Sequence, residues 1–173
     1  KIETKVDRYE DELGTYLVKL NNKDLSEKDS HSVSIMLHCI GDFERISDHA
    51  VNIMESAREL HEKNLSFSPE ARTELQVLAS VVGRIVDTAY DVFDKQDMNL
   101  TRDVEPLEEM VDELSREMKR RHVNRLRSGE CTIEMGFILT DLLTSLERIA
   151  DHATNIAEWV EFSITGIHKA SVV

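Results

Sequence analysis

Apolar residues recur every three or four positions along almost the whole chain, which is the spacing of amphipathic helices. Short polar segments interrupt this spacing at 20–26, 64–69, 95–99 and 127–131. The pattern therefore predicts an all-α protein with five long helices. Their expected ranges are 1–20, 28–63, 69–96, 99–127 and 131–165.

Residues that cap helices mark two of the predicted starts. Ser68 precedes Pro69, and a serine N-cap followed by proline in the first turn is a strong start signal. Ser26 or Asp29 can begin the second helix in the same way. Pro106 falls inside the predicted fourth helix. Because proline lacks an N–H donor, it should kink this helix or mark its true start.

The second and fifth predicted helices carry matching apolar seams, whose members are spaced by four and three residues. The seam of the second helix is Cys39, Phe43, Ile46, Ala50, Ile53 and Ala57. The seam of the fifth helix is Leu142, Leu146, Ile149, Ala153, Ile156 and Val160. Seams with this spacing lie on one side of a helix and pack against other helices in bundles.

The matching seams belong to an internal duplication. The stretch "FERISDHAVNI" (43–53) returns as "LERIADHATNI" (146–156), an offset of 103 residues. Upstream of each copy, "DRYEDEL" (7–13) aligns with "EEMVDEL" (108–114), an offset of 101 residues. The second copy is thus only two residues longer between its matching helices, and the repeat covers most of the chain.

The duplication predicts two repeated antiparallel helical-bundle units. Residues 1–66 form the first unit, with two helices, and residues 67–173 form the second, with three. The counterpart of helix 69–96 is missing from the first unit. Its apolar seam therefore lacks a covering helix, which predicts self-association, as a homodimer, through helices 1–22 and 28–63.

Composition narrows the possible partners. The chain has 34 acidic residues against 21 Lys and Arg, a formal net charge of −13. This charge argues against nucleic-acid binding and suits cation binding or a basic protein partner. No apolar run approaches the length of a transmembrane helix. The two cysteines, Cys39 and Cys131, argue against a disulfide scaffold or a thiolate zinc site, and a reducing, cytoplasmic compartment is expected.

Four pairs of acidic residues stay in register with the duplication. Within each pair the carboxylates are four residues apart, so they share a helix face about 6 Å apart. The pairs are Asp7 with Asp11, Glu44 with Asp48, Glu108 with Asp112, and Glu147 with Asp151. Random placement of 34 acids gives about six or seven such pairs and usually means a solvated face. Chance does not, however, align four pairs with a repeat.

A bound cation explains these pairs best. Like charges at this spacing repel each other by a few tenths of a kcal/mol when exposed, and by more when partly desolvated. Arg45 and Arg148 each follow a glutamate of a pair, but a neighbour at i+1 points about 100° away on a helix. The two arginines are therefore expected to neutralise the pairs poorly. All eight carboxylates are predicted metal ligands.

Carboxylate ligands suit Mg²⁺, Ca²⁺, Mn²⁺ or iron rather than zinc in a thiolate or imidazole site. The Glu-x-x-His spacing of di-iron oxidases is absent. His49 and His152 each follow an aspartate of a pair and face elsewhere, so they are interpreted as interface groups or partners of the ligands. Asp87 and Asp91, a further acidic pair, are interpreted as exposed surface.

The two cassettes "FERISDHAVNI" and "LERIADHATNI" resemble the duplicated signature of PhoU proteins, bacterial regulators of phosphate uptake. The upstream "VDRYEDEL" and "LEEMVDEL" resemble the other acidic motif of that family. The resemblance implies two similar three-helix bundles whose acidic motifs bind divalent or trivalent metal ions in multinuclear clusters. It leaves the metal open among iron, manganese, magnesium and zinc. The matching residues are the eight carboxylates named above.

Two departures from the family pattern matter. Ser47 and Ala150 stand where the family usually has Gly, and both suit a helix at least as well, so ligand placement should survive. Five long helices stand where six are expected, which suggests a piece of a longer protein. The wording "GDFERISDHAVNI" (41–53) is similar to PhoU-like domains that follow the membrane part of bacterial sodium/phosphate cotransporters. A cytosolic domain of such a transporter is therefore expected.

The leading functional hypothesis is a metal-binding regulatory or adaptor domain in phosphate transport. No nucleophile–base arrangement, Gly-rich phosphate loop or redox motif is visible, so enzymatic activity is not expected. The expected partner is the membrane portion of a phosphate transporter or a phosphate-signalling protein. Two alternatives stay open: a carboxylate-bridged metal hydrolase or oxidase, and a metal-free structural bundle.

Overall fold

A computed structural model describes residues 2–166, and every regular element in this part of the chain is a helix. The elements are α1 (Glu3–Asn21), α2 (Glu27–Glu62), α3 (Pro69–Lys95), α4 (Met98–Thr101), α5 (Val104–Ser128) and α6 (Ile133–Thr165). The all-α prediction is confirmed. Lys1 and residues 167–173, which the two predicted units include, lie outside the described residues.

The predicted start signals are confirmed by hydrogen bonds. The hydroxyl of Ser26 accepts from the Asp29 amide at 3.1 Å, and that of Ser68 accepts from the Ala71 amide at 3.2 Å. The predicted helix 99–127 is divided in the structure, because the short helix α4 precedes a separate α5. Pro106 lies in the first turn of α5, where its missing N–H leaves no helical hydrogen bond unmade, so it marks the true start.

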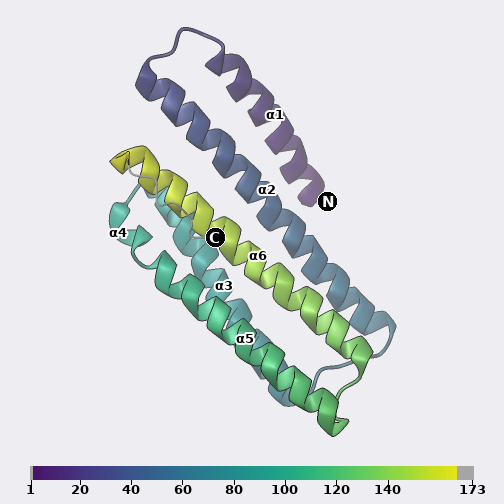
Figure 1. The fold of residues 1–173 in the computed structure, drawn as a ribbon. Coiled ribbons are helices and arrows are strands. Elements are labelled where there is room, and N and C mark those ends of the chain that lie inside the picture. Colours follow the sequence, from purple (N-terminus) through teal and green to yellow (C-terminus); the bar gives the residue numbers. More distant parts are fainter. Residues whose placement is uncertain (1, 167–173) are drawn as a thin grey trace.

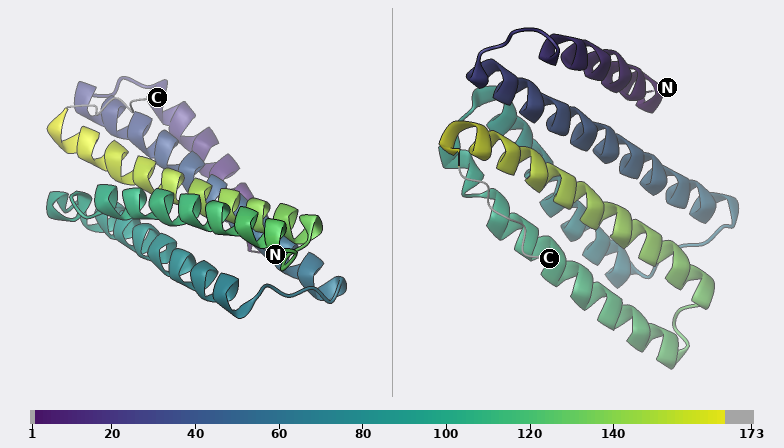
Figure 2. Two further views of the ribbon diagram at one scale, coloured as in Figure 1. Left: turned by 60° about the horizontal axis from the view of Figure 1, so that its bottom comes forward. Right: turned by 45° about the horizontal axis from the view of Figure 1, so that its top comes forward.

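The equivalent helices of the two repeats, α2 and α6, pack side by side and run in opposite directions (Figure 1). On the far side of α6, α3 and α5 complete a three-helix bundle, whereas α1 lies at the opposite edge of the molecule (Figure 2). Among the described elements, α1 packs on α2 alone. The two repeats are therefore built alike in sequence but are covered unequally.

The predicted seam of α6 is confirmed, because all six of its residues are buried. The equivalent seam of α2 is buried only in part, since Ala50 and Ala57 are exposed. The contrast is sharpest at Met54, which is 47% exposed, and its repeat equivalent Ala157, which is 2% exposed. The cause is α3, which covers α6 and has no counterpart on α2.

We expect the purified chain to self-associate through the uncovered side of α1 and α2. Exposed apolar side chains of these helices include Tyr9, Leu13, Tyr16, Met36 and Met54. A second copy is the one partner available in a purified preparation, and burying such surface is favourable. Sedimentation velocity across a wide concentration range should show a monomer–dimer equilibrium.

A matched pair of variants tests where this contact lies. Replacing Met54 with glutamate should shift the equilibrium toward monomer, because a charge would enter the apolar contact. Val77 on α3 is 48% exposed, so replacing it with glutamate is the control and should leave the equilibrium unchanged. A monomer at all concentrations, or equal effects of both variants, would contradict this contact.

Candidate metal sites

The eight predicted ligands fall into two sets, one in each repeat. Asp7 and Asp11 on α1 share the first repeat with Glu44 and Asp48 on α2. The second set comprises Glu108 and Asp112 on α5 with Glu147 and Asp151 on α6. Carboxylates on different helices repel each other within each set: Asp7 repels Glu44, and Asp112 repels Asp151. At least one carboxylate of each helix thus lies close to one of the partner helix in both repeats.

The first site has donor atoms that already converge. One carboxylate oxygen from each of Glu3, Asp7 and Asp48 lies within 4.8 Å of the other two. Oδ1 of Asp7 is buried and has no hydrogen-bond partner, which is costly for a carboxylate oxygen. Asp11 and Glu44 are not part of this group of three. A hard cation fits these three oxygens and would offset the charge of the Asp7 carboxylate, one oxygen of which has no partner.

Glu3 was not among the predicted ligands. It precedes Asp7 by four residues, so a further step along the same helix face would have found it. The second repeat gave no support for it, because its equivalent there is Val104, a buried apolar residue.

Glu44 completes the acidic surroundings of the first site. Its burial, followed by repulsion from Asp48, raises the pKa of Glu44, and Arg45 partly opposes this rise. The Arg45 guanidinium lies 3.5 Å from the Glu44 carboxylate and 3.6 Å from that of Asp48. The expectation that this arginine points away is therefore wrong, because a long side chain can bend back along the helix surface. The contact is mostly exposed, so it offsets the repulsion only weakly.

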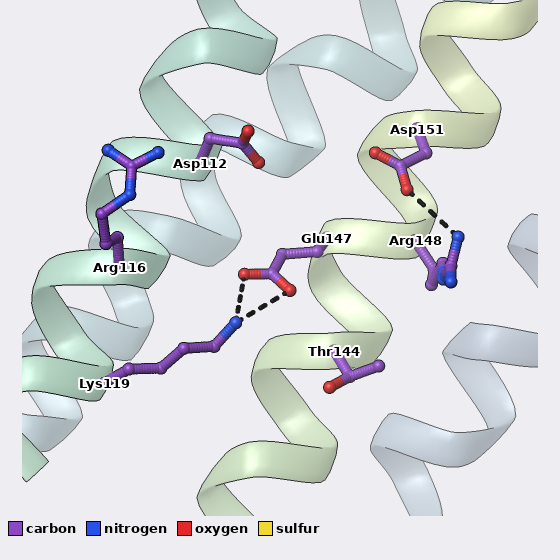
Figure 3. Close-up of a pocket in the computed structure, with 7 residues that line it drawn as sticks. All are labelled: Asp112, Arg116, Lys119, Thr144, Glu147, Arg148 and Asp151. Atoms are coloured by element: carbon purple, nitrogen blue, oxygen red, sulfur yellow. Dashed lines mark hydrogen bonds and ion pairs between the residues drawn. The ribbon is translucent and has the colours of Figure 1, made fainter. Parts of the chain in front are cut away.

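The second site is an open pocket of about 460 Å³ between α5 and α6 (Figure 3). Its acidic lining is Asp112, Glu147 and Asp151, and its basic lining is Arg116, Lys119 and Arg148. Nζ of Lys119 donates to both oxygens of Glu147, at 2.8 and 3.1 Å. Arg148 lies 3.6 Å from Asp151, so this arginine also contacts a predicted ligand, contrary to expectation.

Two carboxyl groups of the second set have raised pKa values. Burial, followed by repulsion from Asp112, raises the pKa of Glu108. Burial also raises the pKa of Asp151, with repulsion from Asp112 added and Arg148 opposing. Both shifts show that the folded chain disfavours the ionised form of these groups. A bound cation would remove that penalty.

The two cassette histidines meet at the centre of the α2–α6 interface. The rings of His49 and His152 stack with their centroids 5.8 Å apart. Since these are equivalent residues of the repeats, an approximate two-fold axis passes between them. Nδ1 of His152 also lies 2.8 Å from Asp42, which accepts a further hydrogen bond from Asn155. The interpretation of the histidines as interface groups agrees with these contacts, and Asp42 was not singled out from the sequence.

The sequence matches the family model described as the PhoU domain over residues 1–57 and 75–160. This chain belongs to the PhoU family. Its similar relatives include the phosphate-specific transport system accessory protein PhoU homolog 1 of Thermotoga maritima, 30% identical over 72% of this chain and 53% of that protein. The PhoU homolog of Pseudomonas aeruginosa is 33% identical over 72% of this chain and 51% of its own length. The chain thus spans about half the length of these relatives.

Solved PhoU structures share the fold. The crystal structure of PhoU from Pseudomonas aeruginosa superposes with a TM-score of 0.79 at 26% identity, covering 95% of this chain and 82% of that one. The PhoU structure from Streptococcus pneumoniae gives a TM-score of 0.84 at 17% identity, covering 96% and 77%, and shows the fold alone. The predicted resemblance is confirmed.

The PhoU family is one of phosphate-transport accessory proteins, in agreement with the expectation that the chain is not an enzyme. No helix among residues 2–166 is long and apolar enough to cross a bilayer. The relatives named above are accessory proteins rather than cotransporters, so the cotransporter link stays a prediction. Metal binding and a cytoplasmic location stay predictions as well.

Proposed function

We propose that this PhoU domain binds divalent metal ions at its two carboxylate sites and thereby regulates phosphate transport. The observation that carries the proposal is the convergence of Glu3, Asp7 and Asp48, with a buried oxygen of Asp7 that lacks a partner. Three oxygens from two helices form a donor set for a hard cation such as Mn²⁺ or Mg²⁺. Glu44 lies close to this group, and Asp112, Glu147 and Asp151 line the pocket of the second repeat.

A metal ion would supply positive charge and a cross-link between helices. In the first repeat it would join α1 to α2, and in the second it would join α5 to α6. The carboxylates hold the ion through their oxygens, and the raised pKa of Glu44, Glu108 and Asp151 would fall once a cation offsets the repulsion.

Regulation would act through the charge of the surface. The chain carries a formal net charge of −13, and neutralising several carboxylates changes the field that an approaching partner meets. The names of the relatives support a partner in phosphate transport. We therefore propose docking to the membrane portion of a phosphate transporter, such as a sodium/phosphate cotransporter, or to a phosphate-signalling protein.

A metal-free bundle is the alternative that specific contacts favour. Arg45, Arg148 and Lys119 each contact a predicted ligand and offset part of the acidic charge without any metal. Exposed contacts of this kind contribute about 0–1 kcal/mol each. They leave the orphaned oxygen of Asp7 unsatisfied, which is why we favour metal binding.

We expect replacement of both Asp48 and Asp151 by asparagine to abolish high-affinity metal binding, because each site loses a charged ligand while the helices persist. Asparagine keeps the size of the side chain, and circular dichroism should report unchanged helix content. The measurement is elemental analysis of protein purified without chelator, followed by titration with Mn²⁺ in a calorimeter.

The matched control replaces Asp87 and Asp91 of α3 by asparagine. This acidic pair has the same spacing and the same charge but lies outside both sites, so its loss should leave Mn²⁺ binding unchanged. Wild-type protein that purifies without metal and takes up no Mn²⁺ would support the metal-free bundle. Equal binding by wild type and the Asp48/Asp151 variant would show that these carboxylates are not ligands.

A further inference from the structure

The two carboxylate sites differ in a way that the duplication makes visible. We infer that the first site is open to a metal ion, whereas in the second site the Lys119 ammonium already holds Glu147 and competes with metal. The inference rests on the proposed function, since it concerns the affinities of the same two sites. It predicts that the two sites fill at different metal concentrations, the first site before the second.

Position-by-position comparison of α1 with α5 gives the first support. Val18 in the first repeat corresponds to Lys119 in the second, at the 101-residue offset. Thr15 corresponds in the same way to Arg116, and both Lys119 and Arg116 line the second pocket. Each difference adds a positive charge to the second site. The second site therefore attracts a cation less strongly.

The difference at Glu3 acts in the same direction. Glu3 contributes an oxygen to the group of three in the first site, whereas its equivalent, Val104, is buried and has no donor atom to offer. At these three positions the first site has one more carboxylate and two fewer cations than the second.

The geometry gives separate support. Both oxygens of Glu147 accept from Lys119, and Asp151 faces Arg148 (Figure 3). Asp48 of the first site has the equivalent contact with Arg45, so the contact that distinguishes the second site is the one between Lys119 and Glu147. Among the described residues, only the first site has three carboxylates whose oxygens converge within 4.8 Å.

The expected size of the effect is modest, because the pair is partly exposed. The side chain of Lys119 is 47% exposed and that of Glu147 is 24% exposed, so solvent weakens their attraction. A divalent ion must displace this ammonium and also bind near Arg116, whose counterpart in the first repeat, Thr15, is uncharged. We expect the affinity of the second site for Mn²⁺ to be about tenfold below that of the first.

Single-site proteins separate the two affinities. Replacing Glu147 by glutamine and Asp151 by asparagine leaves the first site intact. Replacing Glu44 by glutamine and Asp48 by asparagine leaves the second site intact. Calorimetric titration of each protein with Mn²⁺, at fixed ionic strength, should give the tighter binding to the protein that keeps the first site.

Exchanging the residues at the equivalent positions tests the role of the ammonium. Lys119→Met in the protein that keeps the second site removes the charge but retains the apolar stem, and should tighten Mn²⁺ binding about tenfold. Val18→Lys in the protein that keeps the first site should weaken binding by a similar factor. Both positions are about half exposed, so neither change should disturb folding.

A neighbouring cation provides the control. Arg120 adjoins Lys119 in sequence but pairs with Glu117 at 2.7 Å, so Arg120→Met removes equal charge without opening the second site. It should change Mn²⁺ affinity by less than about twofold. A similar gain from Lys119→Met and Arg120→Met would overturn the inference, because net charge alone would then govern affinity.

The outcomes distinguish this inference from the proposed function. Absence of Mn²⁺ binding in both single-site proteins and in wild type would overturn the proposed function, and the inference with it. Binding at both sites with equal affinity, unchanged by Lys119→Met, would overturn the inference and leave the proposed function in place. Tighter binding at the first site and a gain from Lys119→Met would support both.

Discussion

Replacing Leu143 with alanine should lower the free energy of unfolding by about 2–5 kcal/mol, the usual range for a fully buried leucine. Leu143 lies on α6 and has no exposed surface. It belongs to the core cluster that includes Leu78 of α3 and Val111 of α5, so truncation leaves a cavity in the core. Urea denaturation followed by circular dichroism, at concentrations where the chain is monomeric, gives the measurement.

The repeat supplies a matched comparison. Ile40 occupies the equivalent position on α2, where no helix corresponding to α3 covers it, and it is only partly buried. Replacing Ile40 with alanine should therefore cost clearly less than the Leu143 change, since solvent already reaches the site. Equal losses for the two variants would contradict the unequal covering of the repeats.

Saturating Mn²⁺ should raise the melting temperature by about 5–10 °C. A ligand at about 100 times its dissociation constant stabilises the native state by about 2.7 kcal/mol, and each kcal/mol corresponds to about 2–4 °C for a chain of this size. The unfolded chain separates the ligand helices, so it should bind metal weakly. Differential scanning calorimetry with Mn²⁺ and with chelator should show the difference, which should vanish in the Asp48/Asp151 double asparagine variant.

This stabilisation should depend on pH in a defined direction. In the metal-free protein the pKa values of Glu44, Glu108 and Asp151 are raised on folding, so protonation favours the native state. Their contribution is complete below the unfolded pKa and is lost as pH rises through the folded pKa. Metal replaces the proton, so the Mn²⁺ effect should be largest at neutral pH and shrink toward pH 4.5. A shift independent of pH would mean that Mn²⁺ binds elsewhere.

Much of the fold could be predicted because the duplication gives two copies of the same helix pattern, which can be compared position by position. The apolar seam of α6 and the capping serines Ser26 and Ser68 follow from local rules that the structure obeys. The exposure of Ala50 and Ala57 could not be read from their seam alone, since burial depends on which helices pack against that side. It follows only from the missing counterpart of α3.

The candidate sites were harder to predict in detail. The i,i+4 rule locates carboxylates on a helix, and the structure brings Asp7 close to Asp48 and Asp112 close to Asp151 across helices. Helix geometry also predicted that Arg45 points away from Glu44, because the Cβ directions of adjacent residues differ by about 100°. Its side chain is nevertheless long enough to reach Asp48. Lys119 was missed because its counterpart in the first repeat, Val18, is uncharged, so the comparison of acidic pairs did not reach it, although it lies seven residues after Asp112 on the same helix face.

The attachment of α1 has a consequence for the internal motions of the chain. This helix contacts α2 alone among the described elements, and Leu17 is its one buried residue. Its amide hydrogens should therefore exchange through detachment of α1 while the other helices stay folded. A cation bridging Asp7 to Asp48 would oppose that detachment directly. The edge helix would then become the most sensitive reporter of metal occupancy, with slower amide exchange long before the bundle of α3, α5 and α6 responds.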